Sequence, residues 1–280
     1  MHWRFLDTGG QAGDYNMALD AAMTRGGFCV EPTLRVFHWQ PSCISIGYHQ
    51  KAEEIDLEKC QILGIEVVRR PTGGGAILHA QELTYSVIIP ATHPWFQILP
   101  LDLYRRLGEA IAAGLRRLGV DVSFAPGERL RVPGRPLRTA CFASAGRNEL
   151  LAAGKKIVGS AQRRFRQGTL QHGSVLIDEA HRALPDFLTG SETAREAERR
   201  RLADYTTTLQ KVCRRRIAFE EVALAMRRGF AETLRIDFRD AEVLPEEISL
   251  AHTWRERFRI LKQHANAVTG LQEETAEIAN

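Results

Sequence analysis

Residues 69–79 have the sequence Arg-Arg-Pro-Thr-Gly-Gly-Gly-Ala-Ile-Leu-His and follow an apolar, strand-like segment at 65–68. Glycine loses more backbone entropy on folding than any other residue, so three in succession require a reason. A tight hairpin, the simplest interpretation, needs one or two glycines at most. The run from Gly73 to Gly75 therefore favours a loop whose bare backbone N–H groups lie against a ligand, with Arg69 or Arg70 supplying positive charge.

This motif matches neither of the two common phosphate-binding loops. A Walker loop needs GxxxxGK[ST], and a Rossmann fingerprint opens a helix. Here the loop is followed by β-like segments at 76–78 and 84–89. The class of ligand therefore has to come from the rest of the chain.

The composition predicts a soluble chain with a full core. Of the 280 residues 44% are hydrophobic, and no apolar run approaches the roughly 18 residues of a membrane span. Residues 1–7 alternate like a strand and lack the apolar stretch of a signal peptide, so we expect a cytoplasmic protein. The cysteines form no CxxC pair, which argues against a zinc site or a disulfide framework and leaves room for one reactive thiol. They are Cys29, Cys43, Cys60, Cys141 and Cys213.

The net charge is only +4, but arginine supplies nearly all of the positive charge and forms runs at 163–164, 199–201 and 214–216. Such runs are usually solvated helix faces; the alternative is a surface that receives an acidic partner. Aromatic residues make up 8% of the chain, too few for the interleaved basic stripe of a nucleic-acid binder. We therefore expect no nucleic-acid partner.

Hydrophobic periodicity predicts an α/β (α+β) fold with mixed β-sheets flanked by helices. We expect helices at 13–25, with Asp14 as N-cap, at 55–63 and at 100–118, and a strand pair at 33–39 and 43–48 around the turn at 40–42. A strand at 120–124 and a meander at 148–152, 156–165 and 169–177 follow, and the chain is then helical except at 236–240. These patterns favour one domain over residues 1–240 and a helical C-terminal extension over 241–280.

Two further segments contain residues that could carry out chemistry. Cys141 lies in Ala-Cys-Phe-Ala-Ser, and Lys156 begins a strand with small residues in Gly-Lys-Lys-Ile-Val-Gly-Ser-Ala-Gln. Taken singly, a buried cysteine and a surface lysine are the simpler interpretations. Together they suggest a thiolate nucleophile beside an ammonium that also stabilises charge on a carbonyl or phosphate oxygen. His79 and His172 are additional candidates for the site, although each is equally consistent with a structural role.

Three motifs in order, RRPTGGGAILH, GKKIVGSAQRR and LQHGSVLI, resemble the lipoate-attachment enzymes of the lipoyl/biotinyl-ligase superfamily over about residues 3–177. The resemblance implies the lipoyl/biotinyl protein ligase catalytic fold and action on the lysine of a lipoyl carrier domain. ELTYSV at 82–87 and the ACF around Cys141 are similar to the LipM-type octanoyltransferases.

In that family the cysteine matching Cys141 takes an octanoyl group from acyl carrier protein as a thioester, and the lysine matching Lys156 assists. The acyl group then passes to the lysine of a carrier, either a glycine-cleavage H-protein or a dehydrogenase E2 lipoyl domain, with no cofactor. The resemblance implies that the acyl chain, or an acyl-adenylate, contacts residues from all three motifs. They are Arg70, Thr72, Gly73, Gly74, Gly75, Ala76, Ile77, Leu78, His79, Gly159, Ser160, Ala161, His172 and Gly173.

Gly75 leaves a second function open, because the octanoyltransferases usually have arginine there and the ATP-dependent lipoate–protein ligases have glycine. A ligase would use ATP and Mg²⁺ to form lipoyl-AMP, with Arg70 and the backbone of 75–78 holding the nucleotide and Lys156 contacting the acyl carbonyl and phosphate. A third possibility is a non-catalytic binder of lipoyl domains. We expect a monomer with no resident metal and no membrane partner.

Overall fold

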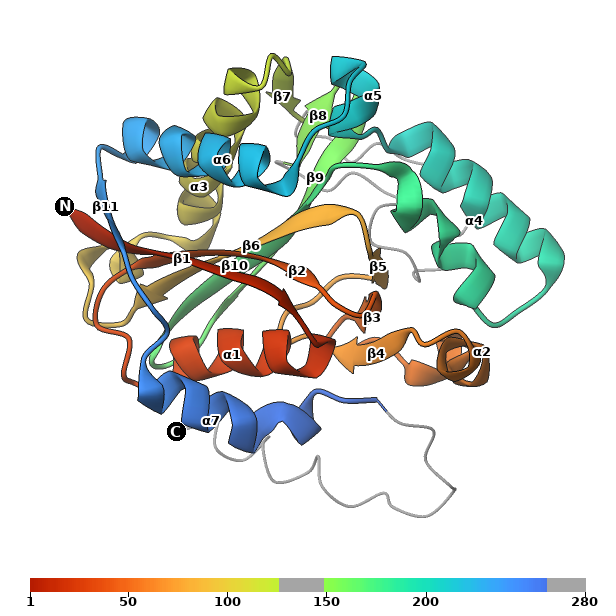
Figure 1. The fold of residues 1–280 in the computed structure, drawn as a ribbon, viewed down its shortest axis with the longest axis horizontal. Coiled ribbons are helices and arrows are strands. Elements are labelled where there is room, and N and C mark those ends of the chain that lie inside the picture. Colours follow the sequence, from red (N-terminus) through yellow and green to blue (C-terminus); the bar gives the residue numbers. More distant parts are fainter. Residues whose placement is uncertain (126–148, 261–280) are drawn as a thin grey trace.

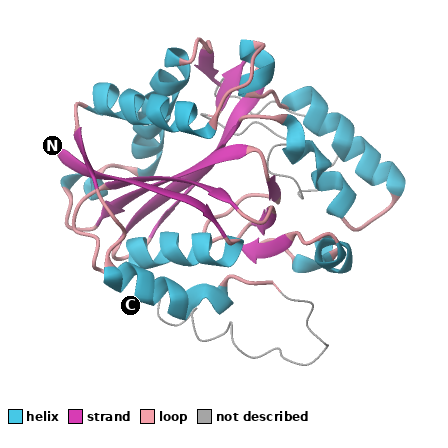
Figure 2. Ribbon diagram, in the orientation of Figure 1, coloured by secondary structure: helices cyan, strands magenta, loops and turns pink. Residues whose placement is uncertain are grey.

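The computed structural model describes residues 1–125 and 149–260, which form two β-sheets with helices around them (Figures 1 and 2). This architecture confirms the predicted α/β class with mixed sheets and a helical C-terminal part. The helices are α1 (Gly13–Arg25), α2 (Leu57–Ile62), α3 (Pro100–Arg117), α4 (Glu192–Tyr205), α5 (Leu209–Cys213), α6 (Phe219–Leu234) and α7 (Pro245–Trp254), with 3₁₀ turns η1 (Ala52–Glu54), η2 (Pro94–Gln97), η4 (Glu179–Phe187) and η5 (Arg255–Arg257). None of the described helices is both long and apolar enough to cross a membrane.

The larger sheet has the order β11-β1-β2-β6-β10-β9-β8-β7. Its strands are β1 (His2–Gln11), β2 (Thr33–Trp39), β6 (Glu82–Pro90), β7 (Val122–Phe124), β8 (Leu150–Ala152), β9 (Lys155–Arg164), β10 (Gly168–Leu176) and β11 (Asp237–Asp240). β1 runs parallel to β2 and β11, while the pairs from β2 through β6, β10, β9 and β8 to β7 are antiparallel. The meander predicted from the sequence is therefore β8, β9 and β10.

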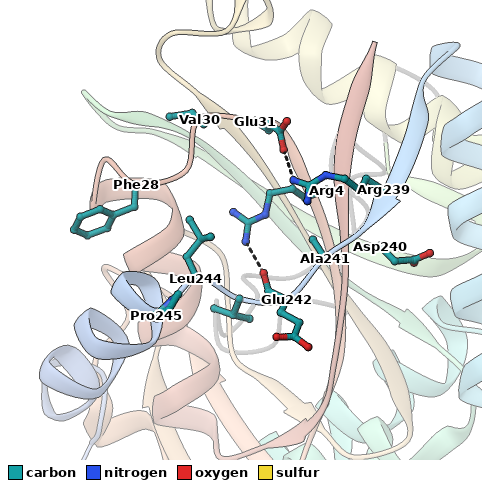
Figure 3. Close-up of a pocket in the computed structure, with 11 residues that line it drawn as sticks. Arg4, Phe28, Val30, Glu31, Arg239, Asp240, Ala241, Glu242, Leu244 and Pro245 are labelled. Atoms are coloured by element: carbon teal, nitrogen blue, oxygen red, sulfur yellow. Dashed lines mark hydrogen bonds and ion pairs between the residues drawn. The ribbon is translucent and has the colours of Figure 1, made fainter.

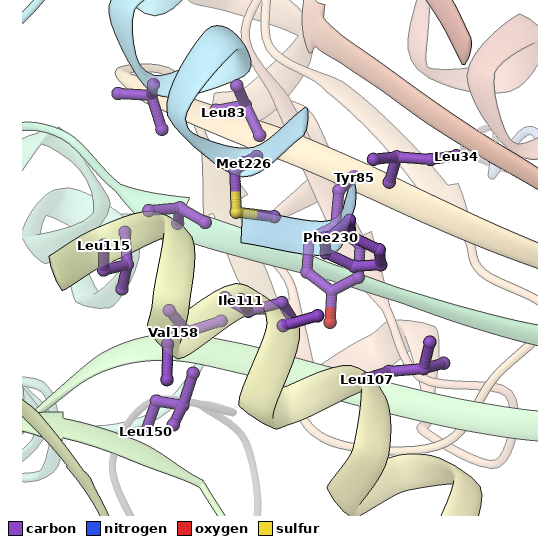
Figure 4. Packing of buried hydrophobic residues seen from close by; sticks show 14 of the residues in the cluster. Leu34, Leu83, Tyr85, Leu107, Ile111, Leu115, Leu150, Val158, Met226 and Phe230 are labelled. Atoms are coloured by element: carbon purple, nitrogen blue, oxygen red, sulfur yellow. The ribbon is translucent and has the colours of Figure 1, made fainter. Parts of the chain in front are cut away.

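Helices α3 and α6 cover one face of the large sheet (Figure 4). Leu107 and Ile111 of α3, with Met226 and Phe230 of α6, pack against Tyr85 and its neighbours on the sheet. The two helices approach closely because Gly229 has no side chain: a Cβ there would lie 2.2 Å from the backbone nitrogen of Gly114. The helix predicted at 100–118 is thus one of the two helices that cover this core.

Helix α1 covers the opposite face, and α7 lies beside α1 (Figure 1). Met17 of α1 packs with Phe37, Ile88 and Leu170 from three strands. A buried ion pair joins the N-terminal strand to α7, with Arg4 donating to Glu247 at 2.9 Å. Residues beyond 240 are therefore bonded to the first strand of the chain; the boundary predicted at 240 stays a prediction.

The smaller sheet has the order β4-β3-β5 and carries the glycine-rich segment between two of its strands. Its strands are β3 (Cys43–Ile46), β4 (Glu66–Arg69) and β5 (Ile77–His79). The outer edge of β4 is covered by the end of the described chain, because Arg69 N–H donates to Phe258 O at 2.8 Å and Ile260 N–H donates to Val67 O at 2.9 Å. The C-terminal segment therefore fixes the strand that leads into the glycines.

Two details predicted from the sequence are wrong. Residues 33–39 and 43–46 are strands but do not pair, because β2 already has β1 and β6 on its two edges, so β3 belongs to the smaller sheet. Asp14 is not the N-cap of α1; Ala12 holds that position without a side-chain cap. The Asp14 carboxylate instead accepts hydrogen bonds from Arg255 and Arg259, which ties α1 to the C-terminal segment.

Candidate active site

The glycine-rich loop joins β4 to β5 and packs directly on the end of β3. Gly74 has φ +103°, a conformation that side chains disfavour. A Cβ on Gly47 would lie 1.9 Å from Gly74 O, so position 47 also has to be glycine. Among the described residues none accepts a hydrogen bond from the N–H groups of Gly73, Gly74 or Gly75. These three donors fit the predicted role of bare N–H groups facing a ligand.

Arg70 holds the carbonyl side of this loop. Its guanidinium is buried and donates to Gly73 O at 2.9 Å, to Gly75 O at 2.7 Å and to Ser45 O at 3.0 Å. Arg69 does the same for the adjacent turn, donating to the carbonyl oxygens of residues 47, 48 and 50. Both arginines therefore bind backbone carbonyl oxygens in this structure, and the predicted contact of their charge with a ligand stays a prediction.

A small apolar cavity lies beside the loop, between the two sheets and α1. Its volume is about 30 Å³. Of the predicted substrate-binding residues, those that line it are Arg70, Ile77, His79, Gly159, Ser160, Ala161, His172 and Gly173. Those that do not line it are Thr72, Gly73, Gly74, Gly75, Ala76 and Leu78. The structure thus brings the three sequence motifs to one place.

His79 forms part of a buried chain of polar groups on one side of the cavity. Its Nδ1–H donates to the Glu82 carboxylate at 2.5 Å, and its Nε2 lies 2.7 Å from Ser45 Oγ. Thr84 and Ser174 hydroxyls also donate to the same Glu82 oxygen at 2.7 Å. Burial alone would raise the pKa of Glu82, but the charge and hydrogen bond of His79 hold it below its usual value. This chain fixes the orientation of the His79 ring.

His172 occupies the equivalent place in a second series of buried hydrogen-bonded groups, on the other side of the cavity. Its Nδ1 lies 3.0 Å from the Asp20 carboxylate, and its Nε2 lies 2.6 Å from the hydroxyl of Thr72. Burial lowers the pKa of His172, which favours the neutral ring. Because a carboxylate can only accept, the neutral ring that fits both contacts donates from Nδ1–H to Asp20 and accepts at Nε2 from Thr72. Asp20 also accepts from Arg35 at 2.8 Å and from Ser86 at 2.7 Å. Helix α1 is thereby connected to the start of the glycine-rich loop.

Lys156 lies near the start of β9, three residues before Gly159. Its side chain is 1% exposed and its Nζ lies 2.5 Å from Oε1 of Glu149. At about 3.3 Å per residue in a strand, Lys156 is about 10 Å along β9 from the cavity lining. Cys141, the predicted nucleophile, lies outside the described residues, so its distance from Lys156 stays a prediction.

The cysteines that the structure does describe are poor nucleophiles. Burial raises the pKa of Cys29, Cys43 and Cys213, and it raises the pKa of Cys60 to about 11. A raised pKa keeps a thiol protonated and unreactive near neutral pH. Among the described residues no group of three or more His, Cys, Asp or Glu could hold a metal ion.

Comparison with known proteins identifies the family. The sequence profile of the lipoyl protein ligase A/B catalytic domain matches residues 13–231, which is most of the chain. The chain belongs to this family. It is 40% identical over 253 residues to octanoyltransferase LipM of Kyrpidia tusciae, covering 88% of this chain and 92% of that protein.

Solved structures agree with the lipoyl protein ligase A/B assignment. The bi-partite lipoate protein ligase studied with its E2 lipoyl domain from Thermoplasma acidophilum superposes with a TM-score of 0.75 at 28% identity, covering 92% of this chain and 93% of that one. A lipoate-protein ligase A bound with ATP gives a TM-score of 0.72 at 29% identity, covering 92% and 95%. These structures confirm the predicted catalytic fold.

Sequence reasoning missed several residues that line the cavity. They are Met17, Trp39, Ser45, Thr84 and Ser174. The signal for the hydroxyl-bearing residues was a polar residue at alternate positions of an otherwise apolar strand, which implies a buried hydrogen-bonded group. Trp39 carried no such signal: its ring stacks on His79 with centroids 4.1 Å apart, and its Nε1–H donates to Thr84.

A larger hollow of about 850 Å³ lies away from this site, between β1, β11 and the start of α7 (Figure 3). Two of its arginines are bonded within the protein, because Arg4 donates to Glu242 O and Arg239 pairs with Glu31 (Figure 3). It contains none of the motif residues of this lipoyl protein ligase A/B family member. The small cavity at the glycine-rich loop is therefore the candidate active site.

Proposed function

We propose that this chain transfers an octanoyl group to the lysine of a lipoyl domain through a thioester on Cys141. The observation that carries this proposal is that residues of all three sequence motifs, including both histidines and three consecutive residues of β9, line one apolar cavity. The name of the Kyrpidia tusciae relative, octanoyltransferase, supports it. The acceptor is a glycine-cleavage H-protein or a dehydrogenase E2 lipoyl domain, and the reaction takes place in the cytoplasm without a cofactor.

The reaction has two balanced steps. The Cys141 thiolate attacks the carbonyl carbon of the octanoyl carrier thioester, and the carrier thiolate leaves and takes up a proton. The lysine amine of the lipoyl domain then attacks the Cys141 thioester, the amide bond forms, and the Cys141 thiolate leaves as the amine loses a proton. Because a thioester keeps enough acyl-transfer potential for an amine to attack, no ATP is consumed.

Lys156 supplies positive charge to this reaction. A buried ammonium lowers the energy of a nearby thiolate and of the oxyanion that forms on the acyl carbonyl. Its ion pair with Glu149 holds the side chain in place, since breaking a buried pair leaves an uncompensated charge. Lys156 therefore acts as an electrostatic group and not as a nucleophile.

The loop N–H groups of Gly73 to Gly75 are the second source of stabilisation. Backbone donors that are free of internal partners can bind a developing oxyanion without rearrangement. Arg70 keeps them in place by binding the loop carbonyls at positions 73 and 75. The octanoyl carbonyl would then lie between this loop and Lys156.

The acyl tail would enter the apolar cavity, where each buried methylene contributes roughly 0.8 kcal/mol. At about 30 Å³ the cavity holds far less than eight carbons, so lining side chains must move. Met17 is the lining side chain best able to do so, since it is flexible and apolar. His79, His172 and Trp39 are held by hydrogen bonds and would remain as the walls.

Trapping of the acyl-enzyme tests the proposal. Incubation with octanoyl carrier protein, without an acceptor, should add one octanoyl group to the enzyme by intact mass, and hydroxylamine should remove it. Cys141→Ser should gain no hydroxylamine-sensitive adduct and should lose transfer. A Cys141→Ser protein that transfers octanoate at the parental rate would end the proposal.

The second candidate function is ATP-dependent lipoate ligation, which the glycine at position 75 and the ATP-bound structural relative favour. With Mg²⁺ and free lipoate the chain would then form lipoyl-AMP and release pyrophosphate. Arg70 and the backbone of 75–78 would hold the nucleotide, and Lys156 would contact the acyl carbonyl and phosphate. Lipoate-dependent exchange of labelled pyrophosphate into ATP would support this route, and its absence at saturating lipoate would dismiss it.

A further inference from the structure

A second arrangement of reactive groups lies in the candidate active site, and the reaction through Cys141 does not use it. Ser45 Oγ lies 2.7 Å from His79 Nε2, and His79 Nδ1 lies 2.5 Å from the carboxylate of Glu82. A hydroxyl, an imidazole and a carboxylate joined in this order form the triad of serine hydrolases, which is recognised by geometry and not by position in the sequence. All three side chains are buried. We call Ser45, His79 and Glu82 the serine triad.

The hydrogen bonds around the triad suit His79 to act as a base toward Ser45. Because a carboxylate can only accept, the neutral ring that fits both contacts donates from Nδ1–H to Glu82 and accepts at Nε2 from Ser45. Arg70 Nη1 donates to Ser45 Oγ at 3.2 Å, and a guanidinium has no acceptor that could take the serine hydrogen. The Ser45 hydroxyl is therefore placed to give its proton to His79.

Two members of the triad, Ser45 and His79, line the apolar cavity, and Arg70 is a lining residue as well. A positive charge next to Ser45 Oγ lowers the energy of negative charge on that oxygen and on the carbonyl oxygen of a bound ester. Arg70 already donates to the loop carbonyl oxygens, so it supplies charge and not an additional donor. We therefore expect slow hydrolysis, which an activated ester makes measurable.

The second series of buried groups shows that the order of groups alone does not select a nucleophile. His172 Nε2 lies 2.6 Å from the Thr72 hydroxyl, and His172 Nδ1 lies 3.0 Å from the Asp20 carboxylate. Thr72, however, does not line the cavity. Ser45 is thus the hydroxyl of the two that a molecule in the cavity can reach.

The size of the cavity limits what Ser45 can attack. A carbonyl carbon has to reach Ser45 Oγ inside the cavity, so the whole acyl group has to enter. At about 30 Å³ the cavity favours the shortest acyl groups, because longer ones displace more of the close-packed side chains around it.

We propose that the serine triad hydrolyses short-chain acyl esters, an activity separate from octanoyl transfer. Ser45 Oγ bonds to the ester carbonyl carbon and its proton passes to His79 Nε2; the bond to the alcohol oxygen breaks, and the alcohol leaves with that proton. Water then attacks the acyl-serine and gives a proton to His79, and the carboxylic acid leaves as Ser45 regains its hydrogen. Glu82 keeps the His79 ring oriented and compensates its positive charge in both steps.

Hydrolysis of p-nitrophenyl acetate by the full-length Cys141→Ala protein tests this proposal, because that variant lacks the thiol of the proposed transfer reaction. Ser45→Ala and Glu82→Gln, each made in the same background, should lower the rate by roughly tenfold or more. Ser123→Ala, the same side-chain change as Ser45→Ala at an exposed position of β7, should leave the rate unchanged. The octanoyl ester of p-nitrophenol should be hydrolysed more slowly than the acetate.

Methanesulfonyl fluoride, a small reagent that modifies activated serine hydroxyls, gives a second readout on the Cys141→Ala protein without further substitution. Its sulfur should bond to Ser45 Oγ with loss of fluoride, and peptide mass mapping should place the methanesulfonyl group on Ser45. An unmodified Ser45, an equal rate for Ser45→Ala and its parent, or faster hydrolysis of the octanoyl ester would overturn the inference. Each of these results leaves octanoyl transfer standing, because the Cys141 reaction does not need the Ser45 hydroxyl.

Discussion

The glycine-rich loop and helix α4 are both rich in arginine, yet the two regions use it differently. Arg70 is buried and donates to three backbone carbonyl groups around the loop. Arg199 is more than one-third exposed and pairs with acidic side chains on α4 and η4. The difference teaches that an arginine run in a sequence has no fixed role, because burial and the kind of acceptor decide what each guanidinium contributes.

The two kinds of contact also differ in free energy. Exposed ion pairs such as those of α4 contribute about 0–1 kcal/mol each, because water and salt screen them. Removing a buried guanidinium leaves several carbonyl oxygens without a donor, at about 1–3 kcal/mol for a buried group. We therefore expect substitutions around the loop to reduce both folding and activity, and substitutions on α4 to leave both nearly unchanged.

The largest effect is expected for Asp20→Ala, beneath the loop. The change leaves Arg35 buried without its carboxylate and releases the His172 ring from its orientation. Loss of one partner of a buried pair should lower the free energy of unfolding by about 3–5 kcal/mol. Urea unfolding measures it, and a loss below about 1 kcal/mol would show that the buried chain contributes little.

Arg70→Ala is expected to come next. It should lower the free energy of unfolding by about 2–3 kcal/mol and kcat by roughly 100-fold, because the loop carbonyls lose their donors and the N–H groups lose their alignment. Arg70→Lys keeps the charge but not the forked geometry, so it should recover stability better than kcat. Equal kcat for Arg70→Ala and wild type would remove the loop from the mechanism.

In the region under α4 the free energy of unfolding should depend on pH because of His181, and not because of the exposed ion pairs on α4. Burial lowers the pKa of His181 to about 4, and its Nε2 lies 2.9 Å from Thr206 Oγ1 at the end of α4. In the unfolded chain His181 takes up its proton at about pH 6.5, the ordinary pKa of histidine. The contribution of the buried neutral ring to the free energy of unfolding is therefore complete above that pH and is lost as the pH falls toward 4. Between pH 7 and pH 4.5 the loss from this group should be about 2 kcal/mol.

Urea unfolding at several pH values checks this expectation when wild type is compared with His181→Gln, which has no proton to gain. Between pH 7 and pH 4.5 the variant should lose about 2 kcal/mol less free energy of unfolding than wild type does. Parallel slopes for the two proteins would mean that His181 is not the group that titrates.

The smallest effect is expected for Arg199→Ala on α4. Its contacts with Asp186 and Glu196 are exposed, so the free energy of unfolding should change by less than about 0.5 kcal/mol and kcat/KM should not change. The same assays as for Arg70→Ala give a matched comparison. A loss as large as that of Arg70→Ala would erase the distinction between the two regions.

Much of the fold could be predicted because its signals are local. The 18-residue helix α3 follows from apolar residues at three- and four-residue steps, and the β8–β10 meander follows from alternation with glycines at the turns. The pairing of β3 could not be predicted, because it depends on which strands occupy the two edges of β2. One of these strands, β6, is distant from β2 in the sequence, so no local pattern shows that it pairs there. Asp14 was misassigned for the same reason: its partners, Arg255 and Arg259, are more than 240 residues away.

The candidate site was predicted in part. Residues of the QHG and GSA segments were expected at the site and line the cavity, whereas the three glycines form the loop that Arg70 holds. Met17 comes from a helix whose sequence carries no motif, so only the packing of α1 brings it to the cavity. The role of Cys141 rests on the family resemblance, because it lies outside the described residues.

Acylation of a lipoyl domain by octanoyl carrier protein in the absence of ATP tests the central claim most directly. The account predicts an octanoyl-lysine product with the wild-type chain, loss of the product with Cys141→Ser, and a strong reduction with Lys156→Ala. Product that appears only when ATP, Mg²⁺ and free acid are supplied, or that forms unchanged without the Cys141 thiol, would contradict it.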